Sequence, residues 1–155
     1  MRTTRGIINS LLGAVFVLCL LAGHNPAGAA EAGWKLLHSE PEHSEFFYDK
    51  GSLDRSAEGM VTVMTKVVYG KEGKAEVLEG RANAKAYQDL TYTLYQYGIN
   101  CETRQSRLQQ IAHVDAKGKR IAEFNLKGKT EWEEIPVGSR LDMLADEECP
   151  PVDGP

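Results

Sequence analysis

The chain is 155 residues long and carries 18 basic against 22 acidic side chains, which gives a net charge of −4 at pH 7. This length suits one domain with a modest hydrophobic core. Because the balance is acidic and the basic residues are scattered, binding to nucleic acid or to an anionic membrane surface is disfavoured.

Residues 1–29 have the layout of a secretory signal peptide. Arg2 and Arg5 give a positive start, an apolar run follows, and small residues supply a cleavage site near Ala29/Ala30. The apolar run is too short to span a bilayer. Cleavage there leaves 16 basic against 22 acidic residues, a net charge of −6, in an exported product.

Cys19 lies inside this apolar run. Leu18 precedes it, where a lipoprotein signal would place a small residue. The sequence therefore predicts no lipid anchor and no stable membrane insertion after cleavage. The expected location is the periplasm or the exterior, including the cell surface. An uncleaved segment that keeps the chain at the membrane is the alternative.

The mature chain consists mostly of predicted short strands separated by turns. β-Branched residues dominate Met60–Tyr69. Its apolar side chains occupy both odd and even positions, as in a central strand that is covered on both faces. The next strand alternates, with Tyr92 on one side and Tyr95 and Tyr97 on the other. The predicted strands in this part are Trp34–His38, Glu45–Asp49, Met60–Tyr69 and Leu90–Ile99.

Residues 70–89, between the last two of these predicted strands, give a weaker indication of secondary structure. Residues 70–80 contain three glycines and five charged side chains, which predicts a loop. Residues 81–89 have helix-favouring alanines but no clean apolar face. A short helix or an irregular connection is expected there.

A hairpin is predicted in the segment that follows the strand Leu90–Ile99. A two-residue loop would split its apolar side chains across two faces, because strand side chains alternate strictly. A three-residue loop at 116–118 instead pairs Asp115 with Lys119 and Ala112 with Ala122. The glycine of that loop supplies the left-handed residue that such loops commonly need.

The chain ends in a predicted helix. Ser139 caps it, Asp142 completes an approximate capping box, and Leu141 and Leu144 lie on one apolar stripe with the following alanine. Two prolines then stop the helix, and residues 150–155 form a flexible tail. Because the helix is too short to persist alone in water, it has to be fastened to the sheet.

Cys101 and Cys149 remain after export. An oxidising compartment favours one intramolecular bridge between them, and such a bridge contributes about 4 kcal/mol in the chain-entropy model. Two free thiols or an intermolecular pair are the alternatives. The expected fold is therefore α+β, a single antiparallel β-sheet with the C-terminal helix tethered to one face by a disulfide.

No catalytic constellation stands out. The chain lacks G-x-S-x-G, C-x-x-C and glycine-rich phosphate-binding motifs, so no catalytic, cofactor-binding or metal-ligating residue is predicted. A proline separates His38 from His43 and breaks the helical spacing of metal ligands. His113 has the parity of a surface or edge residue. The acidic runs 131–134 and 146–148 are interpreted as solvated faces.

The aromatic side chains are the remaining candidates for recognition. Tyrosine and tryptophan are enriched in interfaces, although most of the aromatic residues of a small β domain are expected to pack in its core or on its sheet. The candidates are Trp34, Phe46, Phe47, Tyr48, Tyr92, Tyr95, Tyr97 and Trp132.

A family resemblance rests on motifs along the mature chain, mainly in its last third. They are Asn100-Cys101, Arg104, Asp115-Ala116-Lys117-Gly118, Trp132-Glu133-Glu134-Ile135-Pro136, Gly138-Ser139 and Cys149, with Trp34 and Phe47-Tyr48-Asp49 upstream. Together they resemble the surface-adhesin protein E-like family of small exported bacterial proteins, with residues 30–149 as the family's domain. Val114 is a small departure, since the family tends to have an aromatic residue there.

The resemblance implies a non-enzymatic protein-binding module without a cofactor, built as a sheet with a disulfide-held helix. The best-known member is a lipid-anchored adhesin for extracellular-matrix and serum proteins, and this chain lacks the lipidation cysteine. The expected partner is an extracellular-matrix or cell-envelope protein. The alternative is a periplasmic accessory or envelope-assembly protein that uses the same scaffold without host adhesion. The sequence leaves monomer and homodimer both open.

Overall fold

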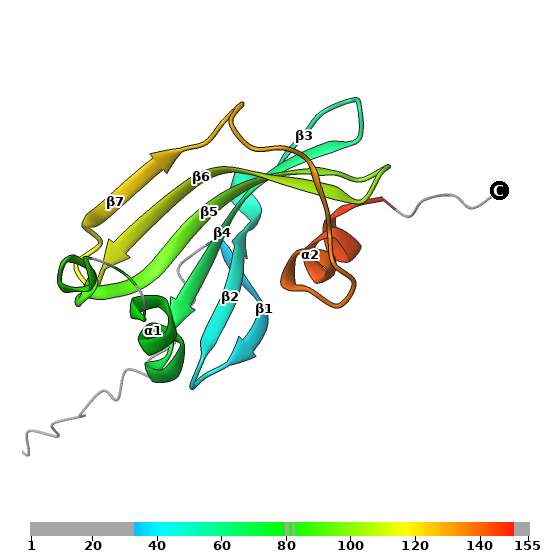
Figure 1. The fold of residues 1–155 in the computed structure, drawn as a ribbon. Coiled ribbons are helices and arrows are strands. Elements are labelled where there is room, and N and C mark those ends of the chain that lie inside the picture. The colour runs from blue at the N-terminus through cyan, green and yellow to red at the C-terminus, as the bar shows by residue number, and fades with distance from the viewer. Residues whose placement is uncertain (1–32, 80, 82, 151–155) are drawn as a thin grey trace, which may run out of the picture.

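The computed structural model describes residues 33–79, 81 and 83–150, so the predicted signal peptide and the tail beyond 150 lie outside the described residues. One antiparallel sheet contains all the strands of this part of the chain (Figure 1). The elements are β1 (Trp34–Glu40), β2 (Ser44–Asp49), η1 (Lys50–Ser52), β3 (Asp54–Arg55), β4 (Met60–Tyr69), α1 (Lys71–Leu78), η2 (Ala84–Tyr87), β5 (Leu90–Asn100), β6 (Gln105–Asp115), β7 (Arg120–Asn125), β8 (Glu133–Glu134) and α2 (Arg140–Glu148).

The main path of the sheet is β1-β2-β4-β5-β6-β7, with β3 paired to β4 and β8 paired to β6. The strand β4 lies in the interior of this order, as its β-branched composition predicted, and Val61 and Val63 are buried. The four strands expected before residue 100 are all present. The predicted α+β class, with one antiparallel sheet and a C-terminal helix, is confirmed.

The prediction of a loop over residues 70–80 is wrong, because α1 occupies Lys71–Leu78. Gly73 is buried where this helix meets the turn between β1 and β2, and a Cβ there would lie 2.0 Å from the His43 carbonyl oxygen. The Gly70 N–H donates to the same carbonyl at 2.9 Å. These glycines permit a close approach of two backbones, which the sequence pattern presented as a break.

The connection after α1 contains the 3₁₀ helix η2, which agrees with the expected short helix or irregular segment at 81–89. It precedes β5 and brings Tyr87 over the sheet, with its ring centroid 5.2 Å from that of His113.

The β6–β7 hairpin confirms the predicted loop but not the predicted register. The Asp115 N–H donates to the Lys119 carbonyl at 3.0 Å, and the loop glycine has a φ of +76°. A bulge on β7 then places Ala122 opposite His113 instead of Ala112, because the extra residue shifts the side chains beyond it by one position. His113 is 5% exposed, so its assignment to the surface or edge is wrong.

The helix α2 covers one end of the sheet, as predicted from its apolar stripe. Leu144 and Ala145 are both fully buried, and the Ser139 hydroxyl accepts a hydrogen bond from the Asp142 N–H at 3.1 Å. The Asp142 carboxylate accepts a hydrogen bond from the Gly138 N–H at 2.8 Å. A capping box would use the N–H of Ser139, one residue later. The core cluster below α2 consists of Tyr48, Val61, Val63, Ile99, Cys101, Ile135, Leu144 and Ala145.

The helices α1 and α2 lie on the same side of the sheet, α2 over one end and α1 beside the β1–β2 turn (Figure 1). Cross-strand pairs on this helix-bearing face include Phe46 with Val67 and Thr65 with Tyr95. The strip of sheet between the helices therefore presents aromatic and β-branched side chains, and it is the part of the fold that positions the candidate site.

Candidate binding groove

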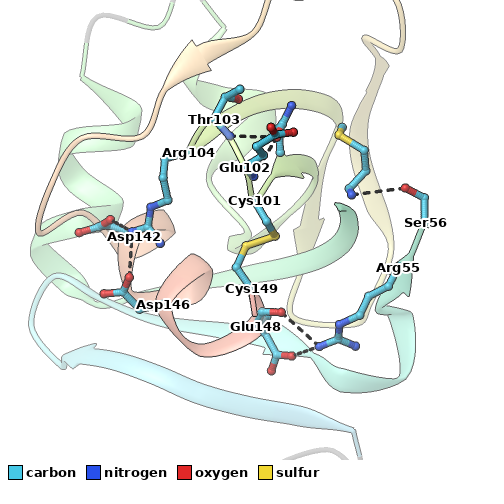
Figure 2. Close-up of a disulfide and its surroundings, with 12 residues drawn as sticks. Arg55, Ser56, Cys101, Glu102, Thr103, Arg104, Asp142, Asp146, Glu148 and Cys149 are labelled. Carbon is cyan, nitrogen blue, oxygen red and sulfur yellow. Dashed lines mark hydrogen bonds and ion pairs between the residues drawn. A yellow bond between two sulfur atoms is a disulfide. The ribbon is translucent and has the colours of Figure 1, made fainter. Parts of the chain in front are cut away.

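The two cysteines singled out in the sequence form a disulfide, with their sulfur atoms 2.06 Å apart. The bridge joins the residue that follows β5 to the residue that follows α2, as Figure 2 shows. It spans a sequence separation of 48 residues, and in the chain-entropy model such a closure contributes about 4 kcal/mol. Cys101 and Cys149 therefore fasten the helix to the sheet, and the candidate site has to be sought elsewhere.

Ion pairs on both sides of the disulfide tie α2 to the sheet (Figure 2). Arg104 contacts Asp142 and also Asp146, the latter at 2.8 Å, while Arg55 contacts Glu148. Desolvation lowers the pKa of Arg104, but its hydrogen bonds with the two aspartates outweigh this effect and the net pKa rises. The run 146–148 is therefore not simply a solvated face, because Asp146 pairs with Arg104 and Glu148 pairs with Arg55.

Tyr48 lies beneath the last turn of α2 and is fully buried. Its hydroxyl donates to Glu147 at 2.8 Å and also contacts Glu148. Burial raises the pKa of the Tyr48 phenol, and the hydrogen bond with Glu148 raises it further. This aromatic residue belongs to the core and is not available for recognition.

A groove of about 550 Å³ lies between α1 and α2 on the helix-bearing face, and we call it the interhelix groove. Its volume is within the range of ordinary ligand sites, about 300–1,000 Å³. The floor is formed by Phe46, Val67, Tyr69, Tyr95 and Tyr97. The walls are formed by Gly73, Glu76 and Val77 of α1 and by Pro136, Ser139, Arg140 and Leu141 at the start of α2.

The tyrosines of the floor pack side by side. The rings of Tyr95 and Tyr97 are stacked with centroids 6.0 Å apart and planes 26° apart, and both side chains are partly exposed. The Tyr95 hydroxyl lies 3.4 Å from that of Tyr69. Burial raises the pKa of Tyr95 and of Tyr97, and the nearby Tyr69 adds to both shifts. The floor therefore offers neutral rings at physiological pH.

A chain of hydrogen bonds supports this floor from inside the fold. The Tyr69 hydroxyl donates to Thr93 Oγ1 at 3.0 Å, and Thr93 Oγ1 lies 2.9 Å from His113 Nδ1. Burial lowers the pKa of His113 below its usual 6.5, and the positive charge of Arg81 lowers it further. The imidazole is therefore neutral at pH 7. Sequence parity missed this role, because both faces of β6 are covered at this point, with Ala112 and Val114 buried on one side and the Tyr87 ring against the histidine on the other.

Charged side chains line the rim of the interhelix groove. The Arg140 guanidinium donates to Ser44 Oγ at 2.6 Å and lies 6.0 Å from the centre of the Phe46 ring. Glu40 and Glu76 supply two largely exposed carboxylates. The hydrogen bond from His38 lowers the pKa of Glu40, and His43 Nε2 lies 3.5 Å from Glu76. The two histidines are thus paired with separate carboxylates.

The remaining candidates do not gather into a chemical site. Lys66 lies within 6 Å of three rings on the opposite face of the sheet, at 4.4 Å from Trp34, 5.2 Å from Phe47 and 5.8 Å from Tyr92. Trp132 stacks against the Arg107 guanidinium at 4.7 Å. Among the described residues, no group of three or more His, Cys, Asp or Glu side chains is placed to hold a metal ion.

The architecture defines a disulfide-fastened α+β domain with an open groove on its helix-bearing face. The family model for surface-adhesin protein E matches residues 34–150, from the first residue of β1 to the residue after Cys149. The chain therefore belongs to the surface-adhesin protein E family, as the resemblance predicted. A comparison with curated proteins finds no significant match to this sequence.

Family membership points to an exported, adhesin-like protein that binds a protein partner. None of the helices in the described part of the chain has the length and apolar character needed to cross a membrane. Of the residues that wall the groove, Pro136, Ser139 and Leu141 were named in the sequence as motif, cap and core positions, but none as a candidate for recognition. Three aromatic residues of its floor, Phe46, Tyr95 and Tyr97, were recognition candidates, whereas Tyr69 was not. Nothing in the pattern separated these three from the aromatic residues that pack in the core or on the opposite face.

Proposed function

We propose that this protein is an exported, non-enzymatic module that recognises an extracellular-matrix or cell-envelope protein through the interhelix groove. The observation that carries the proposal is the row of partly exposed tyrosine rings on the groove floor, bounded by charged side chains. Tyrosine and arginine are enriched at the centres of protein interfaces, where a few anchored aromatic residues carry most of the binding free energy.

The chemistry of the floor favours binding over catalysis. The phenols of Tyr95 and Tyr97 have raised pKa values, so they stay protonated and are poor general bases at neutral pH. Arg140 is engaged with Ser44 and with the Phe46 ring. These groups are arranged to present fixed surfaces to a partner.

The proposal is tested by measuring capture of purified matrix proteins, and of envelope proteins, on the immobilised protein. Tyr95→Ser removes a ring from the groove floor and is expected to abolish most of the captured signal. The matched control is Leu36→Ser, because Leu36 is 47% exposed and pairs with Phe47 on the opposite face of the sheet. Equal capture by the wild type and both variants would contradict a role for the groove.

Protease treatment of intact cells distinguishes an outward-facing adhesin from a periplasmic protein. The adhesin is degraded from outside, whereas a periplasmic protein survives until the outer membrane is opened. Survival in intact cells, combined with capture of envelope proteins alone, would support an accessory protein that uses the same groove without host adhesion.

A further inference from the structure

We propose that the interhelix groove binds an extended segment of its partner that contains proline and carries lysine or arginine beside it. This inference rests on the proposed function and deepens it, since it assigns the chemistry of the segment that enters the groove. The rings of the floor, the charges of the rim and the helices α1 and α2 on either side support it.

The floor suits the rings of proline. The Tyr69 and Tyr95 hydroxyls lie 3.4 Å apart, and Tyr69 donates onward to Thr93, so these hydroxyls are turned toward each other within the fold. What the floor presents is the stacked pair of rings, Tyr95 and Tyr97. Proline-rich segments in the polyproline II conformation dock on aromatic-lined grooves of this kind, and they lose little conformational entropy because their shape is preformed.

The rim favours a positively charged group in the ligand. The carboxylates of Glu40 and Glu76 have side chains that are 56% and 67% exposed. The lowered pKa of Glu40 keeps it ionised to lower pH. The one guanidinium among the lining residues, that of Arg140, donates to the neutral Ser44 hydroxyl and keeps its positive charge, so carboxylates outnumber guanidinium groups two to one at this rim. An anionic segment would meet two carboxylates at this rim, whereas a lysine or arginine would be attracted to them.

The shape of the site fits a continuing chain. The walls come from two separate helices, and the floor is made by three neighbouring strands, β2, β4 and β5. A polyproline II segment is narrow and extended and carries no internal hydrogen bonds. It can therefore lie along a groove while its ends continue outside, which distinguishes it from a ligand that needs an enclosed cavity.

The test uses fluorescence anisotropy with three short labelled peptides. The first alternates proline with alanine and ends in two arginines; the second has glutamates in place of the arginines; the third has glycines in place of the prolines. The first is expected to bind, and the other two at least roughly tenfold more weakly, since losing either the charge match or the preformed shape lowers affinity.

Two variants of the protein locate the binding. Tyr95→Ser is expected to weaken the first peptide roughly tenfold, and Glu76→Lys roughly three- to tenfold, with a reduced dependence on salt. The matched control is Glu79→Lys, an exposed position at the end of the same helix that does not line the groove. It is expected to change the affinity less than twofold.

Three results would overturn the inference: no binding of the first peptide, equal binding of the acidic or glycine peptide, or binding unchanged by both groove variants. If the first peptide fails while Tyr95→Ser still abolishes capture of a matrix or envelope protein, the proposed function stands and the ligand class is wrong. If the peptide binds as expected and no protein is captured, the groove is correctly assigned and the partner class is wrong.

Discussion

The two ends of the helix-bearing face are built in different ways. At the disulfide end, formed by α2 and the residues around Cys101, the helix packs on a hydrophobic core and is held by a covalent bond and by ion pairs to Arg104 and Arg55. At the groove end, α1 meets the rest of the fold through glycine backbone at Gly70 and Gly73. The first arrangement supplies stability, and the second leaves aromatic side chains accessible beside the helix.

The disulfide end allows this small exported domain to keep a binding surface open at the groove end. A domain of this size buries a limited core, and its total stability is of the order of 5–15 kcal/mol. A disulfide worth about 4 kcal/mol is a large share of that total. With one helix fastened in this way, the strip of sheet next to it need not be fully covered, and its tyrosines remain partly exposed.

The largest expected effect comes from breaking the disulfide end. Cys149→Ser should lower the free energy of unfolding by about 4 kcal/mol and the melting temperature by roughly 15 °C, because α2 loses its covalent tie to the sheet. Thermal unfolding followed by circular dichroism measures this change. Reduction of the wild type with a thiol reagent is the matched control and should give the same shift. An unchanged melting curve would show that the bridge contributes little.

The next largest effect comes from breaking the groove end. A Cβ at position 73 would lie 2.0 Å from the His43 carbonyl oxygen, so Gly73→Ala should displace α1 and destabilise the fold by about 1–3 kcal/mol. Urea unfolding measures the stability, and partner capture or peptide binding measures the groove. The exposed control Lys71→Ala on the same helix should change both by little. A Gly73→Ala variant that binds normally would contradict the role of α1 as a wall.

Titration of His113 is expected to change stability at the groove end. Its pKa is lower in the folded state than the unfolded value of 6.5, so the unfolded chain takes up the proton first as the pH falls. Stability is therefore unaffected above about pH 7 and decreases as the pH falls below about 6.5. His113→Asn keeps an acceptor for Thr93 but cannot titrate, and urea unfolding between about pH 7.5 and about pH 5 should show a flatter profile. A profile parallel to that of the wild type would contradict the buried neutral imidazole.

The smallest expected effect concerns Asp142 at the disulfide end. The Gly138 N–H and the Arg104 guanidinium hold its pKa below the usual 3.8, so its contribution to stability is complete above about pH 5 and is lost as the pH falls through the lowered folded pKa. Asp142→Asn should make the free energy of unfolding fall less as the solution becomes acidic. At pH 7 the variant should lose little more than the contribution of the ion pair with Arg104. Acid unfolding curves test this, with the exposed Glu58→Gln as a control that should follow the wild type.

Much of the fold could be predicted from local patterns. Alternation and β-branched composition identified β4 and β5, and the cap at Ser139 with the stripe from Leu141 identified α2. These signals are local, because each depends on neighbouring residues of one element. The disulfide followed from export and from the count of cysteines left in the mature chain, and the structure confirms the pairing of Cys101 with Cys149.

The candidate site was less predictable because it depends on contacts between distant segments. Gly73 was interpreted as part of a loop, since its packing against His43 is visible only in three dimensions. The burial of His113 was also missed, because the Tyr87 ring that packs against it comes from a distant segment. Tyr95 and Tyr97 were among the recognition candidates, but only the placement of α1 and α2 shows that they form the floor of a groove.

Amide hydrogen exchange of the oxidised protein, with and without the proline-rich basic peptide, tests the division between the two ends most directly. We predict that the peptide slows exchange in the segments that line the groove, 43–46, 73–77, 95–97 and 136–141, and leaves the segments 101–104 and 145–149 unchanged. Slower exchange confined to the segments around the disulfide, or no change at the groove, would contradict the account.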